Sequence, residues 1–256
     1  MDPLHLSIEL SALLFTIGFI AGLVDAIAGG GGLIALPTLM FLGLPPQVAL
    51  GTNKLQGCFG TFSASYNYIR KKQVSLKKAR PGIFFTLIGA TIGSCIVQAL
   101  SPEILEPIIP ILLFAVFIYL LLAKNIGNQR HQPRLTSTPF YMIFGISLGF
   151  YDGFFGPGTG SFWTVAFLFF MGMNMTESTG YTKIMNFTSN IIALSWFVIG
   201  GNVNYSIGLI MGSGQIIGAR VGSSLAMRKG AALIKPILLS VVLATILRLM
   251  YASYIQ

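Results

Sequence analysis

A motif that joins one aspartate to a glycine-rich break occurs twice in this chain, each time inside strongly apolar sequence. The first copy reads GLVDAIAGGGG over residues 22–32, and the second reads GFYDGFFGPGT over residues 149–159. Apolar surroundings make both a carboxylate and unpaired backbone amides costly. Because the same cost recurs at two matching places, the pattern predicts one site built in two parts.

The composition indicates that this site lies in a lipid bilayer. Of the 256 residues, 54% are hydrophobic and only 9% are charged, and the mean hydropathy is +0.78. These values predict an all-α polytopic membrane protein. The net charge of +9 does not indicate nucleic-acid binding, because twelve of the sixteen basic residues lie in three stretches without any acidic residue. The positive-inside rule predicts that these three loops, 70–80, 124–134 and 228–235, are cytoplasmic.

Ten apolar runs, bounded by glycine, proline or charge, predict the helical segments. At about 1.5 Å per residue, the runs of about 17 or more residues can cross a core of ~30 Å. The two shorter runs lie beside the glycine breaks, which predicts broken helices or helical hairpins. The count is about 8 full transmembrane helices if the short runs form hairpins, and up to 10 otherwise. The predicted segments are 8–28, 32–43, 53–69, 82–100, 106–123, 139–155, 160–172, 182–200, 207–227 and 236–254.

The two halves of the chain are duplicates of each other. An offset of 129 residues places Lys54 on Lys183, and the aspartate motif repeats at an offset of 127. Equivalent loops differ in charge: the basic stretch 70–80 corresponds to the uncharged residues 200–205. Equivalent loops therefore face opposite sides of the membrane, which predicts inverted repeats about a pseudo-twofold axis in the membrane plane. The predicted units are a first repeat of five segments, a cytoplasmic linker and a second repeat of five segments, over residues 1–123, 124–138 and 139–256.

The glycine breaks are candidates for binding an anion. If they lie at depth, the helices that follow them direct free N–H groups and the positive ends of their dipoles into the gap. Glycine also lets a ligand approach the backbone closely. The alternative is a tight turn between packed helices, and the second copy of the motif favours the binding site. The candidate residues are Gly30, Gly31, Gly32, Gly158 and Thr159.

Two lysines at equivalent positions, Lys54 and Lys183, open the third segment of each half. An ammonium group beside a cavity can neutralise an anion or pair with a carboxylate. The structural alternatives are an Asp25–Lys54 or Asp152–Lys183 pair that holds segments together, or a lysine that extends to the membrane interface. Asp25 and Asp152 are also the candidates for proton coupling, because burial favours the neutral form of a carboxyl group.

Neutral polar side chains surround the lysines. Asn186 and Asn190 share one helical face with Lys183, and Asn53 and Gln56 flank Lys54. These groups can donate hydrogen bonds to an oxyanion, although asparagine also joins helices within membranes. At the positions that match the two asparagines, the first half has only a glycine and a threonine. The sequence therefore predicts more polar contacts from the second half.

Several kinds of chemistry are not indicated. The two histidines, His5 and His131, lie near the N-terminus and in a loop, so neither metal-ligand spacing nor a histidine-based triad is present. The sequence also contains no phosphate-loop lysine motif. We therefore expect no metal, no cofactor and no enzymatic activity, and we expect any transport to be driven by a gradient.

Several separated motifs resemble the sulfite exporter TauE/SafE family, also called the TSUP permeases. They are the stretch 22–32, LGTNKL at 50–55, FYDGFFGP at 150–157 and GARVG at 218–222. The resemblance extends over nearly the whole chain and is closest to bacterial inner-membrane members of unassigned substrate. It implies a transporter of small anions such as sulfite, sulfoacetate or other organosulfonates.

Together these observations predict a secondary transporter of the bacterial inner membrane, an exporter of a small anion that works by alternating access at a midplane site. Lys54 and Lys183 would supply positive charge, and Asn53, Asn186 and Asn190 would supply hydrogen bonds. The coupling ion would be a proton. An anion channel and an uptake permease for a small carboxylate remain alternatives, and a homo-oligomer is left open.

Overall fold

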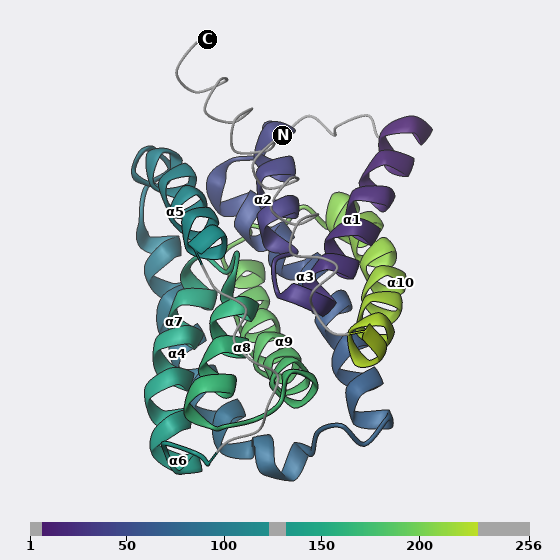
Figure 1. The fold of residues 1–256 in the computed structure, drawn as a ribbon. Helices are drawn as coiled ribbons and strands as arrows, with labels where there is room; N and C mark the ends of the chain where they lie inside the picture. The colour runs from purple at the N-terminus through teal and green to yellow at the C-terminus, as the bar shows by residue number, and fades with distance from the viewer. Residues whose placement is uncertain (1–6, 123–131, 230–256) are drawn as a thin grey trace.

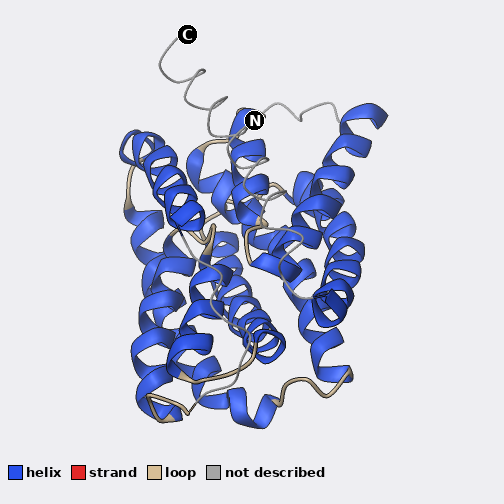
Figure 2. Ribbon diagram, viewed as in Figure 1, coloured by secondary structure: helices blue, strands red, loops and turns tan. Residues whose placement is uncertain are grey.

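The computed structural model describes residues 7–122 and 132–229, and within these ranges all regular structure is helical (Figure 2). The first half contains α1 (Ile8–Ala28), α2 (Gly32–Phe41), α3 (Pro46–Arg70), α4 (Leu76–Ala99) and α5 (Pro102–Leu122). The second half contains α6 (Ser137–Phe140), the π-helical turn η1 (Tyr141–Gly145), α7 (Ile146–Phe154), α8 (Thr159–Phe170), α9 (Met175–Ile199) and α10 (Tyr205–Lys229).

The predicted segments agree closely with these helices, except at four N-termini. Helix α1 has the predicted bounds, and its N-cap Ser7 accepts a hydrogen bond of 3.2 Å from the Leu10 N–H. Helices α3, α4 and α9 each begin about two turns before the predicted apolar run, and α5 begins about one turn before it, because their first turns contain polar residues yet are still helical. The predicted segment 236–254, most of the basic stretch 228–235 and residues 124–131 of the linker lie outside the described residues.

Two of the described helices, α1 and α4, are long and apolar enough to cross a membrane by length and composition. Helices α3 and α9 are longer but carry many polar residues, and most of these are buried. Large apolar side chains instead lie exposed on the outside, for example Phe62, Phe84 and Ile199. This distribution, with a polar interior and an apolar surface, is the one that a lipid environment favours.

Helix α1 packs along α10, and α4 packs along α7. Both interfaces depend on glycines that bring two backbones into close contact, and a methyl group at any of them would lie less than 3 Å from the facing helix. Close packing at small residues stabilises helix pairs where the hydrophobic effect between helices is absent. The glycines that make these contacts are Gly214, Gly218 and Gly222 in α10 and Gly89 and Gly93 in α4.

The two glycine breaks meet. Figure 1 shows α1 and α2 in the upper part of the molecule and α6, α7 and α8 below them. Gly29 ends α1 in the left-handed conformation, with φ of 75°, and a Cβ atom there would lie 2.5 Å from the Gly160 Cα. The Ser161 hydroxyl donates a hydrogen bond of 2.6 Å to the Ala28 carbonyl. The two parts of the repeated motif therefore form one contact region.

Candidate functional site

Two buried ion pairs connect the halves of the chain. The Lys54 ammonium lies 2.8 Å from Asp152 Oδ1, and the Lys183 ammonium lies 3.0 Å from Asp25 Oδ2. Each lysine also donates to the main-chain carbonyl of the same aspartate. The alternative of an Asp25–Lys54 or Asp152–Lys183 pair is therefore wrong, because each lysine is held by the aspartate of the other half.

The two aspartates differ in how firmly they are held. Both carboxylate oxygens of Asp152 are hydrogen bonded, Oδ1 by Lys54 and Oδ2 by the Ser189 hydroxyl, and its side chain is 5% exposed. The Asp25 side chain is 16% exposed. Its Oδ1 lies 3.4 Å from the Gly31 N–H, which is longer than an ordinary N–H···O bond. Asp25 is therefore the more accessible and less firmly bound of the two.

This difference follows from one substitution between the halves. The position equivalent to Ser189 is Gly60, which has no hydroxyl group to offer. The space beside it is filled by Gln215 from α10, so that a Cβ atom at Gly60 would lie 3.1 Å from the Gln215 Cδ. A neutral amide thus fills the space beside Gly60, where the second half has the hydroxyl that bonds to Asp152.

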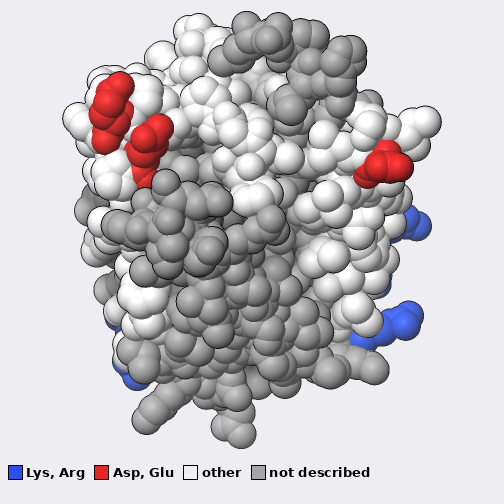
Figure 3. Space-filling view, turned by 90° about the horizontal axis from the view of Figure 1, so that it is seen from above, with Lys and Arg blue, Asp and Glu red and all other residues white. Residues whose placement is uncertain are grey.

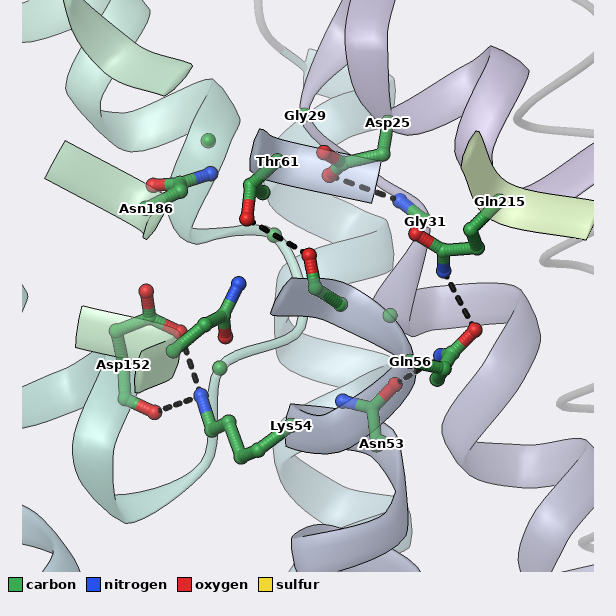
Figure 4. Close-up of a pocket in the computed structure, with 16 residues that line it drawn as sticks. Asp25, Gly29, Gly31, Asn53, Lys54, Gln56, Thr61, Asp152, Asn186 and Gln215 are labelled. Atoms are coloured by element: carbon green, nitrogen blue, oxygen red, sulfur yellow. Dashed lines mark hydrogen bonds and ion pairs between the residues drawn. The ribbon is translucent and has the colours of Figure 1, made fainter. Parts of the chain in front are cut away.

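Three hydrogen-bonded amide side chains, of Gln215, Gln56 and Asn53, connect α10 to the glycine break after α1 (Figure 4). Gln215 Nε2 donates to Gln56 Oε1 at 2.5 Å, and Gln56 Nε2 donates to Asn53 Oδ1 at 2.7 Å. Asn53 faces the break after α1, since a Cβ atom at Gly32 would lie 3.5 Å from its Nδ2. Buried amides are stable when they bond to each other, and these three amides join α10 and α3 at the break.

A cavity of about 40 Å³ lies between these groups. Since one water molecule needs roughly 10–15 Å³ of cavity volume, the cavity has room for about three water molecules. A small anion of the same total volume would also fit. Of the predicted site residues, those that line it are Asp25, Gly31, Gly32, Asn53, Lys54, Asp152, Gly158, Asn186 and Asn190. Those that do not line it are Gly30, Thr159 and Lys183.

The Lys183 ammonium is paired with the Asp25 carboxylate, and the Lys183 side chain is 0% exposed. Thr159 donates its hydroxyl to the Gly156 carbonyl at 2.6 Å, within the turn that leads into α8. The lysine of the first half, Lys54, lines the cavity, but its side chain is only 1% exposed. The most accessible charged side chain of the two ion pairs is thus the Asp25 carboxylate.

Asn186 and Asn190 present the polar wall of α9. Asn186 is 5% exposed, and its Oδ1 is buried without a hydrogen-bond partner in the described part of the chain. A Cβ atom at Gly57 would lie 3.2 Å from Asn190 Nδ2, so the missing side chain there keeps room for the amide. An unpaired buried polar atom is costly, and beside a cavity it indicates a partner that enters from outside.

Sequence reasoning missed Ser189 and Gln215. Gln215 is an amide within an apolar, glycine-rich helix, and this contrast was a usable signal. Ser189 gave no signal, because a small hydroxyl side chain is common in membrane helices. The cavity lining does not bear out the prediction of more polar contacts from the second half, because Asn53, Gln56 and Thr61 of α3 line it as well as Asn186, Asn190 and Gln215.

Within residues 7–122 and 132–229, no group of three or more His, Cys, Asp or Glu side chains is placed to hold a metal ion. The charged groups of the site are instead two lysines and two aspartates, arranged around broken helices. Comparison with known proteins identifies the family of the chain. The family model for the sulfite exporter TauE/SafE matches residues 14–249.

The chain belongs to the TauE/SafE family. It is 42% identical over 247 residues to the "Probable membrane transporter protein YfcA" of Escherichia coli K12, covering 96% of this chain and 92% of that protein. It is 43% identical over 245 residues to the "Probable membrane transporter protein ORF9" of Sinorhizobium, covering 96% and 94%. A "Probable membrane transporter protein" of Haemophilus influenzae is 40% identical over 233 residues, covering 91% of each chain. No solved structure matches the chain.

Proposed function

We propose that this TauE/SafE family member is a secondary transporter that exports a small anion, of the sulfite or organosulfonate class, by alternating access. The observation that carries the proposal is the small polar cavity at the meeting point of two broken helices. Three of the four residues of the two ion pairs, Asp25, Lys54 and Asp152, line it. The name of the family model supports the substrate class and the direction.

We further propose that the halves are inverted repeats. The contacts support this relation, because Lys54–Asp152 has its counterpart in Lys183–Asp25 at the repeat offsets. Likewise the packing of α1 on α10 has its counterpart in the packing of α7 on α4. Transporters with such repeats place their substrate near the bilayer midplane, between discontinuous helices.

The charge of the two ends supports an orientation with the α3–α4 loop in the cytoplasm of the bacterial cell. That loop lies at the lower end of the molecule in Figure 1, and its basic residues between 70 and 80 are exposed. At the opposite end, Glu9, Glu103 and Glu106 are exposed. Figure 3 looks down on this end and shows acidic side chains on it, with Lys and Arg at its margin. The positive-inside rule then places the basic end inside.

The charge balance of the site supports coupling to protons. Two lysines and two aspartates sum to zero, so an entering monovalent anion leaves one negative charge in excess. An uncompensated charge in such surroundings is costly. Protonation of one aspartate restores neutrality and frees one lysine, so that the anion gains a cationic partner.

The test is uptake of radiolabelled sulfite and sulfoacetate into proteoliposomes that contain the purified protein. Lys54→Ala with Lys183→Ala should abolish the flux, because the cationic partners are lost. Lys77→Ala with Lys78→Ala removes two exposed cations outside the site and should leave the flux unchanged. An unaltered flux in the Lys54/Lys183 variant would sink the assignment.

Two alternatives are separated by related measurements. An anion channel would give a current across planar bilayers that rises without saturation and needs no counter-ion, whereas a transporter saturates. An uptake permease for carboxylates would be inhibited in counterflow by acetate or succinate rather than by sulfonates. Either result would replace the proposed function.

A further inference from the structure

The proposed function leaves open which of the two aspartates carries the proton. The two carboxylates differ in their exposure and in their hydrogen bonds. We propose that Asp25 is an internal competitor for the transported anion and leaves its place when protonated, whereas Asp152 stays bound to Lys54 when the anion binds. This inference rests on the proposed function.

Asp25 occupies the position that suits an entering anion. Its carboxylate lies against the Lys183 ammonium at 3.0 Å and faces the N–H of Gly31, the N-cap residue of α2. The positive end of a helix dipole and a lysine together form a ready anion site. The protein's own carboxylate fills that site here, so an anion can enter only after the carboxylate is neutralised or displaced.

The exposure of the two side chains also favours neutralisation of Asp25 before the anion binds. The Lys183 side chain is 0% exposed, while the Asp25 side chain in front of it is 16% exposed. An anion in the cavity therefore meets a negative charge first. When Asp25 takes up a proton, its attraction to Lys183 falls, and the site gains one positive charge for the anion.

Asp152 lacks these properties. Its two oxygens are held by Lys54 and by Ser189, and its side chain is 5% exposed. The second oxygen of Asp25 accepts only the longer contact of 3.4 Å from the Gly31 N–H, whereas the second oxygen of Asp152 accepts from a hydroxyl group. Since the equivalent of Ser189 is Gly60, the first half cannot hold Asp25 in the same way.

The other charged groups around Asp25 do not change this picture. The described helices α2 and α8 contain no titratable residue. From α9 the facing group is Lys183, and Lys54 on α3 and Asp152 on α7 share the cavity. Helix α10 contributes the neutral Gln215 to the cavity lining, whereas its Arg220 is not part of that lining. Lys183 is thus the direct ionic partner of Asp25.

The consequence is a proton bound with each anion. If each anion binds together with one proton, the apparent dissociation constant should rise about tenfold per pH unit wherever the free protein lacks that proton. A monovalent anion would then cross without net charge movement.

The experiment is calorimetric titration of the purified full-length protein with methanesulfonate and with sulfoacetate. Both keep a constant charge between about pH 6 and about pH 8, well above the reference pKa of a carboxyl group, so any proton uptake belongs to the protein. Titration near pH 8 in two buffers of different ionisation enthalpy gives the number of protons taken up. The variants are Asp25→Asn, Asp152→Asn and Ser189→Ala.

The expected result is about one proton per anion in the wild type, none in Asp25→Asn and about one in Asp152→Asn. Binding to Asp25→Asn should also lose its pH dependence. If Asp152→Asn does not fold, Ser189→Ala decides: it should leave the pH midpoint of binding unchanged, whereas a proton carried by Asp152 would move the midpoint to higher pH. Proton uptake that persists in Asp25→Asn would overturn the proposal. Loss of anion binding when choline replaces sodium in the buffer would also overturn it, because sodium rather than the proton would then be the coupled ion. Failure of both sulfonates to bind the wild type near pH 6 would instead count against the proposed function.

Discussion

Replacement of Gly29 by alanine tests whether the contact between the two glycine breaks holds the molecule together. Gly29 has φ of 75°, and a Cβ atom there would lie 2.5 Å from the Gly160 Cα and 2.6 Å from the Ser161 nitrogen. Both neighbours are backbone atoms, so no side chain can rotate away. An ordinary contact is about 3.5–4.0 Å, and the two breaks must therefore separate by about 1 Å.

The cost has two parts that a matched control can separate. A left-handed conformation costs a non-glycine residue about 1–2 kcal/mol. Overpacking against a rigid neighbour adds about 1–3 kcal/mol, so Gly29→Ala should lose about 2–5 kcal/mol. Gly43 has φ of 80° with nothing within 4 Å of a Cβ atom, so Gly43→Ala should lose only the first part.

The assay is thermal unfolding of each purified variant, followed by size-exclusion chromatography, together with anion flux in proteoliposomes. At about 2–4 °C per kcal/mol for a chain of this size, Gly43→Ala should lower the midpoint by a few degrees and Gly29→Ala by clearly more. Gly29→Ala should also lose flux, because the displaced break carries Asp25. Equal midpoints for the two variants would show that the breaks do not touch as described.

Three further substitutions test the polar contacts of the site. Lys54→Ala should destabilise the protein by about 3–5 kcal/mol in thermal unfolding, because it leaves the buried Asp152 carboxylate without its cation; a loss below 1 kcal/mol would mean that the pair is not buried. Gln215→Leu should cost about 1–3 kcal/mol by leaving the Gln56 Oε1 without its donor. The added substitution Gln56→Leu should recover part of that loss, so an additive double variant would contradict the contact. Ser189→Ala should cost about 1–2 kcal/mol, since a hydrogen bond to a charged group is removed; an unchanged midpoint would argue against this bond.

The sequence predicted the helices well where apolar pattern and burial agree. The bounds of α1 follow from one apolar run between Ser7 and the glycine break, and the structure has the same bounds. At α3 the pattern and the burial disagree. Pro46 to Thr52 include polar residues that are buried nevertheless, because they face other helices rather than lipid. An apolar pattern therefore marks lipid-facing helices and fails for the innermost ones.

The ion pairs show a different limit. The residues themselves, two aspartates and two lysines, stand out in the sequence because charges are rare in apolar segments. Their pairing does not, since Asp25 lies nearer to Lys54 along the chain and nothing in the spacing excludes that pair. Only the way the halves interlock brings Lys183 to Asp25 and Lys54 to Asp152. The inequality of the pairs depends on Ser189, which carries no sequence signal of its own.

Pairing across the halves also bears on how a transporter of this kind avoids a leak. Each break carries the aspartate that holds the lysine of the other half, so moving either break away disrupts one pair. An unpaired buried charge costs about 3–5 kcal/mol, and moving both breaks at once would cost roughly 6–10 kcal/mol. At 1.4 kcal/mol per factor of ten, the doubly open state is suppressed by about four orders of magnitude or more. A bound anion with its proton can compensate for the loss of one pair but not of two. The same four residues would therefore favour opening on one side at a time, which is the property that separates a coupled transporter from a channel.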